Sequence, residues 1–565
     1  MKKAALFLGI AALLVILPNA SGAIVTITQS VCNTGDANVT WYDGNTYFLN
    51  VDGNVDIENC QLTILPGAVV KYVASGPINP GSFLRILNKG VLKAQGTSAS
   101  KIVFTSQNDD SVGQIITGST GTPVPADYNT AIWFSNSAGI TSDANSFSDL
   151  NIGFAMQALV IRRYIGEIHD NNIHDNNGGS LSGVGIVVST GTVDNMYNNT
   201  VKNNRATSGR RVGVNIDGGT VRNFYHNTIT NNSSNGTAPG MYLINSTNNF
   251  YGNIISWNDT GSSGSDVGGL VLGGTATITN FYDNTLNNNG GAWGGAMQCS
   301  STLTTTITNF YNNTFNDNNA GRGAGLYVGC GITNLYNNTF SNNSTTSNGA
   351  GIWVEKTILN FYDNTISSNS SATNGGGMYV ISGIESFYNN LLKNNSADIN
   401  GGGIYDKNII QYFYNNTFFN NSAADGGEIH TQDSNGILRN AYNNIFAYNT
   451  GTAVSTSGGE LDSNFNAYWA NDTNTAGYTE GTQSIYLGAT PFASDSTTDT
   501  NSDRNFLYNS YGIAQLQGMG NSSTGTDSWF AARTIRADNR LDYNRSIGWH
   551  ADQNSPYISI INPQV

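Results

Sequence analysis

Residues 307–327 read ITNFYNNTFNDNNAGRGAGLY, and close variants of this stretch recur every 25–31 residues along the chain. Asparagine fills two positions in all eleven copies. The recurring Tyr position is occupied by Tyr197, Tyr225, Tyr251, Tyr282, Tyr311, Tyr336, Tyr362, Tyr388, Tyr414 and Tyr442, with His169 one repeat earlier. The first Asn column, two residues after Tyr, holds Asn171, Asn199, Asn227, Asn253, Asn284, Asn313, Asn338, Asn364, Asn390, Asn416 and Asn444. The second column, five residues further on, holds Asn176, Asn204, Asn232, Asn258, Asn289, Asn318, Asn343, Asn369, Asn395, Asn421 and Asn449.

The repeat predicts short strands separated by tight turns. An apolar position such as Phe315 lies between the two Asn columns, and a Gly-rich turn then leads into a short apolar strand, as in GAGL at 323–326. One repeat cannot bury its apolar side alone, so successive repeats must stack as coils about 4.8 Å apart. An Asn at a tight turn tolerates the left-handed backbone conformation, and its side-chain amide can bond the next Asn in the stack. The pattern therefore predicts an all-β parallel solenoid of about 14 coils with asparagine ladders.

The composition excludes several classes of protein. The 565 residues include about 80 Asn, 66 Gly and only 10 Pro, and charged residues make up 11%. The good helix formers Glu, Lys, Arg and Gln are scarce, which disfavours a helical fold. A hydrophobic share of 38% and an aromatic share of 10% suffice for a core, which disfavours disorder. A net charge of −14 makes nucleic acid a poor partner.

The motifs F-x-x-N and G-G-[AG]-[ILM] resemble the repeats of the chlamydial polymorphic outer-membrane proteins and related surface proteins. F-x-x-N occurs at 315–318 and 418–421, each followed by a variant of the glycine motif, GAGL at 323–326 and GGEI at 426–429, and the resemblance covers about residues 165–450. The stretches LTILPGAVVKY (62–72) and KIVFTS (101–106) resemble the first coils of secreted, pectate-lyase-like β-helix proteins. The resemblance implies a single-stranded right-handed parallel β-helix and indicates function only weakly. The segment after residue 450 lacks ten-residue alternating strands, so the resemblance does not extend to that family's autotransporter barrel.

The chain divides into four predicted segments. Residues 1–23 read as a secretory signal peptide, with Lys2 and Lys3 before an apolar run at 4–17 and small residues at 21–23. We expect an N-terminal cap and first coils over 24–110, β-helix repeats over 111–454 and a C-terminal capping region over 455–565. The apolar run is short for a membrane span, and no second run occurs. These features predict a secreted or cell-surface protein with no integral membrane segment after signal cleavage.

The four cysteines fit an oxidising compartment. Cys32 and Cys60 flank the first expected coil and could join the N-terminal cap to it. Cys299 and Cys330 are 31 residues apart, about one repeat, so a disulfide between neighbouring coils is geometrically feasible. The chain has no C-x-x-C motif and no paired His, which argues against metal binding by these cysteines.

Calcium is the one cofactor that the sequence suggests. Asp499, Asn501 and Asp503 have the spacing of the first ligands of a calcium loop. The sixth position is Arg504 rather than Gly, and no Glu stands at the twelfth. We expect no other cofactor.

Residue alternation predicts which aromatic side chains face outward. The residue before the Tyr position accepts any apolar shape, as in Met196, Phe250 and Leu335, so we expect it in the core and Tyr outside. A second outward column follows the Gly turn and holds Tyr327, Trp353, Tyr379 and Tyr405, with His430 in line. Aromatic stripes can stack on sugar rings, but stacked aromatics also stabilise sheets, and both interpretations stay open.

Two charged clusters could carry chemistry. The densest basic cluster could hold an anionic glycan, or its members could be solvated loop charges, with Arg222 pairing with Asp194 of the adjacent coil. It contains Lys202, Arg205, Arg210, Arg211 and Arg222. The densest acidic cluster supplies the catalytic candidates Glu428 and His430, which we expect to share a face because they are two residues apart. Asp425, Asp433 and Lys407 lie close to them in the repeat.

These features predict a non-catalytic adhesin or matrix component that binds polysaccharide or a cell-surface glycan through stacked aromatic residues. One alternative is a polysaccharide lyase or glycoside hydrolase, which would need clustered carboxylates. Another is a self-assembling cell-envelope protein. About a dozen and a half Asn-x-Ser/Thr sequons also occur. Most are expected from composition, and ladder asparagines should not be accessible to glycosylation.

Overall fold

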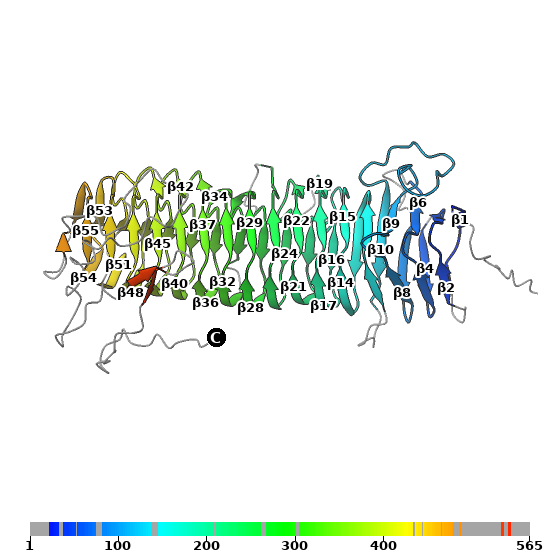
Figure 1. Cartoon of the computed structure of the whole chain (residues 1–565), viewed down its shortest axis with the longest axis horizontal. Helices are drawn as coiled ribbons and strands as arrows, with labels where there is room; N and C mark the ends of the chain where they lie inside the picture. Colours follow the sequence, from blue (N-terminus) through cyan, green and yellow to red (C-terminus); the bar gives the residue numbers. More distant parts are fainter. Residues whose placement is uncertain are drawn as a thin grey trace, which may run out of the picture.

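The computed structural model describes residues 22–477, except 33–37, 52, 75–81, 137–144, 208–210, 262–266, 301–303, 433–434, 443 and 465, together with 485–486, 533–535 and 541–543. These residues form a right-handed parallel β-solenoid that is elongated along one axis (Figure 1). Strands are the only regular elements in this part of the chain. The predicted all-β solenoid with asparagine ladders is therefore confirmed.

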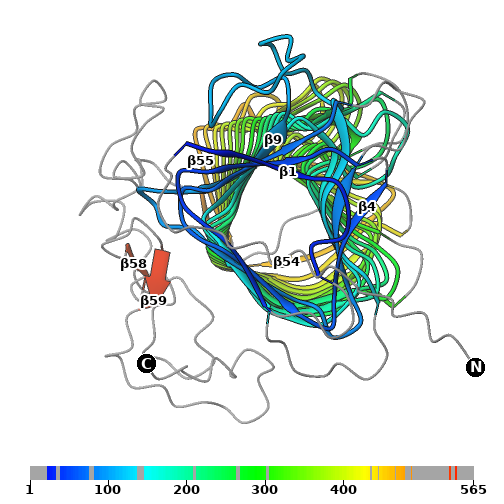
Figure 2. The same ribbon diagram turned by 90° about the vertical axis from the view of Figure 1, so that its right-hand side faces the viewer.

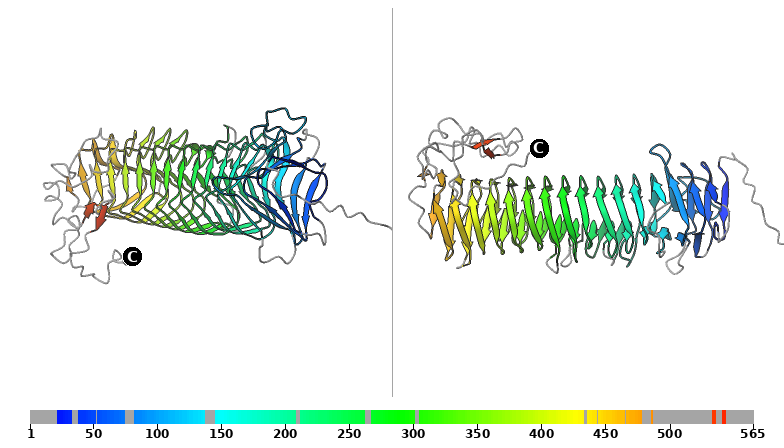
Figure 3. Two further views of the ribbon diagram at one scale, coloured as in Figure 1. Left: turned by 45° about the vertical axis from the view of Figure 1, so that its right-hand side comes forward. Right: turned by 90° about the horizontal axis from the view of Figure 1, so that it is seen from below.

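Three long parallel sheets run the length of the molecule and enclose its core (Figures 2 and 3). Sheet 1 has 18 strands, from β1 (Ile24–Ile27) to β57 (Ile485–Tyr486). Sheet 2 has 16 strands, from β4 (Asn54–Glu58) to β56 (Thr473–Ala476). Sheet 3 also has 16 strands, from β2 (Val39–Trp41) to β54 (Glu460–Asn464). A separate antiparallel pair joins β58 (Arg533–Ile535) and β59 (Leu541–Tyr543).

One coil illustrates the repeat. It places β32 (Thr306–Tyr311) in sheet 3, β33 (Thr314–Asn316) in sheet 1 and β35 (Leu326–Val328) in sheet 2. Between the last two, β34 (Asn319–Arg322) joins a short sheet 4 with β30 (Gly290–Trp293), β38 (Ser344–Thr345), β42 (Ser370–Ser371) and β46 (Ser396–Ala397). In the next coil, β36 (Gly331–Tyr336) pairs with β32 so that Tyr336 lies over Tyr311. Equivalent residues of successive repeats therefore stack directly.

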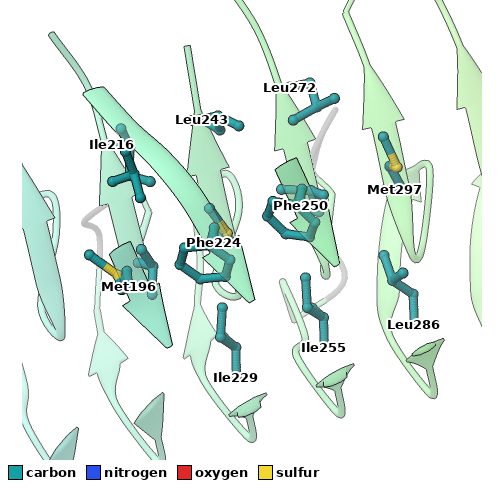
Figure 4. Close-up of a cluster of buried hydrophobic side chains, with 14 of the residues drawn as sticks. Met196, Ile216, Phe224, Ile229, Leu243, Phe250, Ile255, Leu272, Leu286 and Met297 are labelled. Atoms are coloured by element: carbon teal, nitrogen blue, oxygen red, sulfur yellow. The ribbon is translucent and has the colours of Figure 1, made fainter. Parts of the chain in front are cut away.

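The core is a column of apolar side chains contributed by all three long sheets. Phe224 and Phe250 point inward from β21 (Thr220–Tyr225) and β25 (Thr247–Tyr251), opposite Leu243 of β24 (Met241–Leu243) (Figure 4). Their exposed fractions are 0–1%. Burying such side chains stabilises the fold by about 1.5–3 kcal/mol each. Because the residue before each Tyr is buried and the Tyr itself is half-buried, the predicted alternation in sheet 3 is correct.

The coils extend beyond the predicted repeat region at both ends. Strands β1 to β9 (Ile102–Ser106) join the same three sheets as the later repeats, so much of residues 24–110 is solenoid. A loop over 107–127 follows them. It is held by the buried Lys71, whose Nζ donates to the carbonyl oxygens of Asp109 (2.6 Å) and Gln114 (2.8 Å). At the other end, coil strands continue past residue 454 through β56. Residues 1–21 of the expected signal peptide lie outside the described residues.

Both cysteine pairs form disulfides. Cys32 is bonded to Cys60, with their Cα atoms 6.3 Å apart, near the N-terminal end of the solenoid. Cys299 is bonded to Cys330, with their Cα atoms 5.5 Å apart, and this bond joins two neighbouring coils. Each disulfide therefore covalently fixes the stacking of one coil on the next.

Candidate functional site

Two inner asparagine ladders line two corners of the solenoid. Asn313 shows the repeating geometry: its Nδ2 donates to Oδ1 of Asn338 in the next coil (3.0 Å) and to the carbonyl oxygen of Phe281 in the previous coil (3.1 Å). Its backbone N–H also donates to Asn338 Oδ1 (3.0 Å). The left-handed conformation belongs to the preceding residue, Asn312 (φ 58°), so the expectation that the ladder Asn adopts it is wrong. The ladders satisfy backbone groups at the corners, which makes them structural.

A third asparagine ladder lies on the outer face of sheet 3, and the sequence analysis missed it. Asn309 Nδ2 donates to Oδ1 of Asn280 (3.0 Å), and Asn334 Nδ2 donates to Oδ1 of Asn309 (3.0 Å). Its members are half-buried and occupy seven successive coils: Asn195, Asn223, Asn249, Asn280, Asn309, Asn334 and Asn360. The signal was present in the sequence, because each lies two residues before the Tyr of its repeat.

A tyrosine ladder runs beside the outer asparagine ladder. The rings from Tyr197 to Tyr414 stack with centroids 4.8–5.0 Å apart and interplanar angles of 0–7°. His169 stacks on Tyr197 and begins the row. Burial and the nearby Glu167 carboxylate raise the pKa of Tyr197 to about 12. Burial also raises the pKa of Tyr336 and Tyr362, and phenols are neutral hydrogen-bond donors near pH 7 even at their ordinary pKa.

The aromatic stripe on sheet 2, expected to present ring faces to sugars, is instead almost covered. Tyr327, Trp353, Tyr379 and Tyr405 are only 3–8% exposed and form a cluster separate from the core. Successive rings stack at 4.5–5.9 Å, and His430 stacks on Tyr405. Because each ring face packs on the next ring, little face remains for a sugar. The expectation that this column is accessible on the outside is therefore wrong, and its burial favours the alternative interpretation, that the stacked aromatics stabilise the sheet.

The Gly-rich turns explain this burial. Gly323 has φ 56°, and a Cβ on it would lie 3.1 Å from Trp353 Cβ, so the turn packs closely on the stripe. The Arg322 guanidinium lies over Trp353, 5.3 Å from the ring centroid. The Tyr327 hydroxyl donates to Glu355. Turn backbone and charged side chains thus enclose the stripe, an arrangement that sequence alternation does not predict.

The two catalytic candidates do not share a face. Glu428 is fully buried and accepts a hydrogen bond from Asn421 of the second inner ladder. Burial raises its pKa well above the usual range. His430 lies in the outer stripe, with Nδ1 2.8 Å from Ser455 Oγ and 3.3 Å from Asp425 Oδ2. The chain bends at Glu428, so that residue and Ile429 both point inward, and the simple alternation fails there.

The basic cluster is divided among different sheets. Arg222 lies in β21 of sheet 3 and pairs with Asp194 of the previous coil, as the alternative interpretation expected. Arg205 is exposed in β19 (Arg205–Ala206), which belongs to a two-stranded sheet. Arg211 pairs with Asp217 and lies 3.7 Å from the ring centroid of Tyr242. Arg210 lies outside the described residues. The described members therefore do not converge on one anion site.

The sequence predicts one candidate calcium site and no integral membrane segment after signal cleavage. Asp499, Asn501 and Asp503 lie outside the described residues. Within the described ranges, no three His, Cys, Asp or Glu side chains are grouped so that they could hold a metal ion. Among the same residues, no helix is long and apolar enough to span a membrane.

The chain shows little similarity to known proteins. No family model matches the chain, and no curated protein matches it. Among solved structures, the chain is similar to the A-module of mannuronan C-5 epimerase AlgE6 from Azotobacter vinelandii. The identity is 11%, the match covers 78% of this chain and 92% of that chain, and the TM-score is 0.19. A likeness at this level carries no argument about function.

Proposed function

We propose that the protein is exported and acts as an adhesin or matrix component that binds an extended, uncharged polysaccharide along the outer face of sheet 3. The observation that carries this proposal is the pairing of the tyrosine ladder with the outer asparagine ladder. Each coil repeats the same polar groups at nearly the same position, about 4.8 Å from those of the next coil. A polymer with regularly repeated hydroxyl groups can bind many such units at once.

The chemistry of this face suits a neutral ligand. A carboxamide has two N–H donors and two lone pairs, and the ladder itself uses one of each. The strands from β25 to β40 (Ile358–Tyr362) contain no charged residue in sheet 3. Between their core positions, Thr279 and Thr308 are exposed and Thr333 is half-buried. Tyrosine hydroxyls, carboxamides and threonine hydroxyls therefore alternate across strands that carry no charged side chain. Sugar hydroxyl groups are natural partners for such a surface.

The placement of the catalytic candidates supports a binding role rather than an enzymatic one. Glu428 contacts an inner ladder and is fully buried, whereas His430 is held in the outer stripe by Tyr405 and Ser455. A general acid or base must come within hydrogen-bond distance of the substrate. Glu428 and His430 point into different packed layers, so this pair does not offer a joint acid–base site.

Co-elution of the mature protein with neutral and anionic polysaccharides in size-exclusion chromatography tests the proposal, with and without calcium. We expect neutral polymers to co-elute uncut. Replacing Tyr282, Tyr311 and Tyr336 together by Phe keeps the ring stack but removes three hydroxyls, so binding should weaken by tenfold or more. The matched control is Tyr379→Phe, which removes a hydroxyl from the covered stripe and should leave binding unchanged. Polymer shortening, or undiminished binding by the triple variant, would contradict the proposal.

A further inference from the structure

At three corners of sheet 1, two consecutive asparagines lie in opposite environments. Asn198 (φ 54°), Asn231 (φ 54°) and Asn312 (φ 58°) adopt the left-handed conformation, and their side chains are exposed. The ladder asparagines that follow them, Asn199, Asn232 and Asn313, are buried. An Asn–Asn pair at these corners therefore has one carboxamide in solvent and one in a ladder.

A hydroxyl residue follows these three pairs. Ser344 likewise follows the pair that begins with Asn342 (φ 54°), but Asn342 Nδ2 is engaged with Asn316 Oδ1 (3.2 Å). Thr200, Ser233 and Thr314 complete an Asn-x-Ser/Thr sequon for the exposed asparagine, which is the acceptor motif for N-linked glycans in exported proteins. The corner itself does not require a hydroxyl there, because Arg205 and Leu391 follow equivalent Asn pairs in other coils.

We propose that Asn198, Asn231 and Asn312 carry N-linked glycans, given the export on which the proposed function also rests. Asn198 and Asn312 lie at the corner between sheets 3 and 1, since each precedes a sheet 1 strand, β18 (Thr200–Lys202) or β33. Asn231 lies at the opposite edge of sheet 1, between β22 (Thr228–Thr230) and β23 (Ser233–Ser234). The glycans would therefore line both edges of sheet 1.

The reaction needs an exposed carboxamide and an activated sugar. The donor is an oligosaccharide linked to a polyprenyl diphosphate, bound by a transferase outside this chain. The acceptor Nδ2 forms a bond to the anomeric carbon while the bond from that carbon to the diphosphate oxygen breaks. The lipid diphosphate leaves with the electron pair, and one amide proton passes to a base of the transferase. No oxidation or reduction takes place.

Two asparagines at the same corners serve as internal negative controls. Asn232 also begins a sequon, with Ser234 at its third position, but its Nδ2 donates to Asn258 Oδ1 (3.1 Å) and to the Val201 carbonyl oxygen (3.0 Å). Both of its amide hydrogens are therefore engaged inside the solenoid, and a glycan would remove the rung. Asn203 is the converse case, since it is exposed and left-handed (φ 56°) but is followed by Asn204 and Arg205.

Glycopeptide mass spectrometry of the protein isolated from its natural source tests the proposal. We expect glycans on Asn198, Asn231 and Asn312, and none on Asn203 or Asn232. Unmodified asparagine at all three exposed positions, or a glycan on Asn232, would overturn it.

Two variants expressed in the same source sharpen this test. Thr200→Val keeps the β-branched shape and should abolish the glycan on Asn198 alone. Arg205→Thr creates a sequon at Asn203 and should add one glycan there, because Arg205 is exposed and Thr suits a strand. Far-UV circular dichroism checks that both variants fold. A folded Arg205→Thr protein that gains no glycan on Asn203 would contradict the proposal, because this variant has both a sequon and an exposed asparagine at the corner.

Discussion

The side-chain amide of Asn421 donates to Glu428 instead of to Asn449, the next asparagine of its ladder. Asn395, one coil earlier, keeps the regular pattern and donates to Asn421 Oδ1 (2.8 Å). The interruption leaves Asn449 Oδ1 and Glu428 Oε1 buried without hydrogen-bond partners. Each unsatisfied buried polar atom costs about 1–3 kcal/mol. This coil is therefore a local weak point in an otherwise regular stack.

Replacing Glu428 by Gln should stabilise the protein at neutral pH. Burial raises the folded-state pKa of Glu428, so this group favours folding most below its unfolded pKa of about 4.3. The contribution is lost as the pH rises through the folded pKa. The melting temperature of the Glu428→Gln variant should thus exceed that of the original protein at pH 7 and approach it near pH 4.

The control for that comparison is Glu385→Gln, which changes an exposed carboxylate on sheet 3. We expect its stability to stay within about 0.5 kcal/mol of the original at each pH. Asp406, whose pKa is also raised by burial, is retained in both variants. Parallel melting profiles for Glu428→Gln and the original protein from pH 4 to 8 would show that Glu428 does not titrate as described.

An inner ladder rung should matter more than an outer one. Asn364 Nδ2 donates to the Leu335 carbonyl oxygen (3.0 Å) and to Asn390 Oδ1 (3.2 Å), and all of these groups are buried. Asn364→Ala should cost about 1–3 kcal/mol in urea unfolding, because it leaves buried groups without partners. Asn309→Ala, in the half-buried outer ladder, should cost less than about 1 kcal/mol, since water can replace the lost amide. Equal losses would indicate that the inner ladders do not stabilise the corners.

The sequence predicts those features that every coil repeats. The Asn columns, the inward Phe224 and the outward Tyr225 follow from registered stacking, because identical coils must bury the same positions. The burial of Glu428 could not be predicted in this way, because Glu428 occupies the repeat position that holds Gly377 and Gly403 in earlier coils. A Cβ on Gly377 would lie 2.5 Å from the Gly403 carbonyl oxygen, so a side chain there must displace its surroundings. The burial of Trp353 likewise depends on turns that alternation does not describe.

Trp353 should prove a stabilising residue rather than a ligand contact. Its ring lies between those of Tyr327 (5.9 Å) and Tyr379 (4.5 Å), and it is 6% exposed. Trp353→Ala should cost about 3 kcal/mol or more in unfolding while leaving polysaccharide co-elution unchanged. The matched control is Trp257→Ala, because Trp257 is 59% exposed and should contribute less than about 0.5 kcal/mol. Loss of polysaccharide binding by a folded Trp353→Ala protein would restore the stripe as a binding surface.

The disulfide between Cys299 and Cys330 should stabilise the middle of the solenoid. It closes a loop with a sequence separation of 31 residues, and a cross-link of this size is worth about 2–4 kcal/mol through the unfolded chain. Replacing both cysteines by Ala should lower the urea midpoint accordingly. With both proteins under reducing conditions, where Cys32–Cys60 opens in each, the original protein and the variant should have the same midpoint. An unchanged midpoint of the variant under oxidising conditions would show that coil stacking alone holds this region.

The asparagine ladders also give the solenoid a net side-chain dipole along its long axis. In the inner ladders the bonds between successive asparagines run from Nδ2 of one coil to Oδ1 of the next coil toward the C-terminus, as from Asn313 to Asn338. In the outer ladder they point the opposite way, as from Asn309 to Asn280. Two rows of aligned amide dipoles therefore oppose one, and their sum does not vanish along the axis. The side-chain amides alone make the two ends of the solenoid electrostatically different, without the help of any ionised residue.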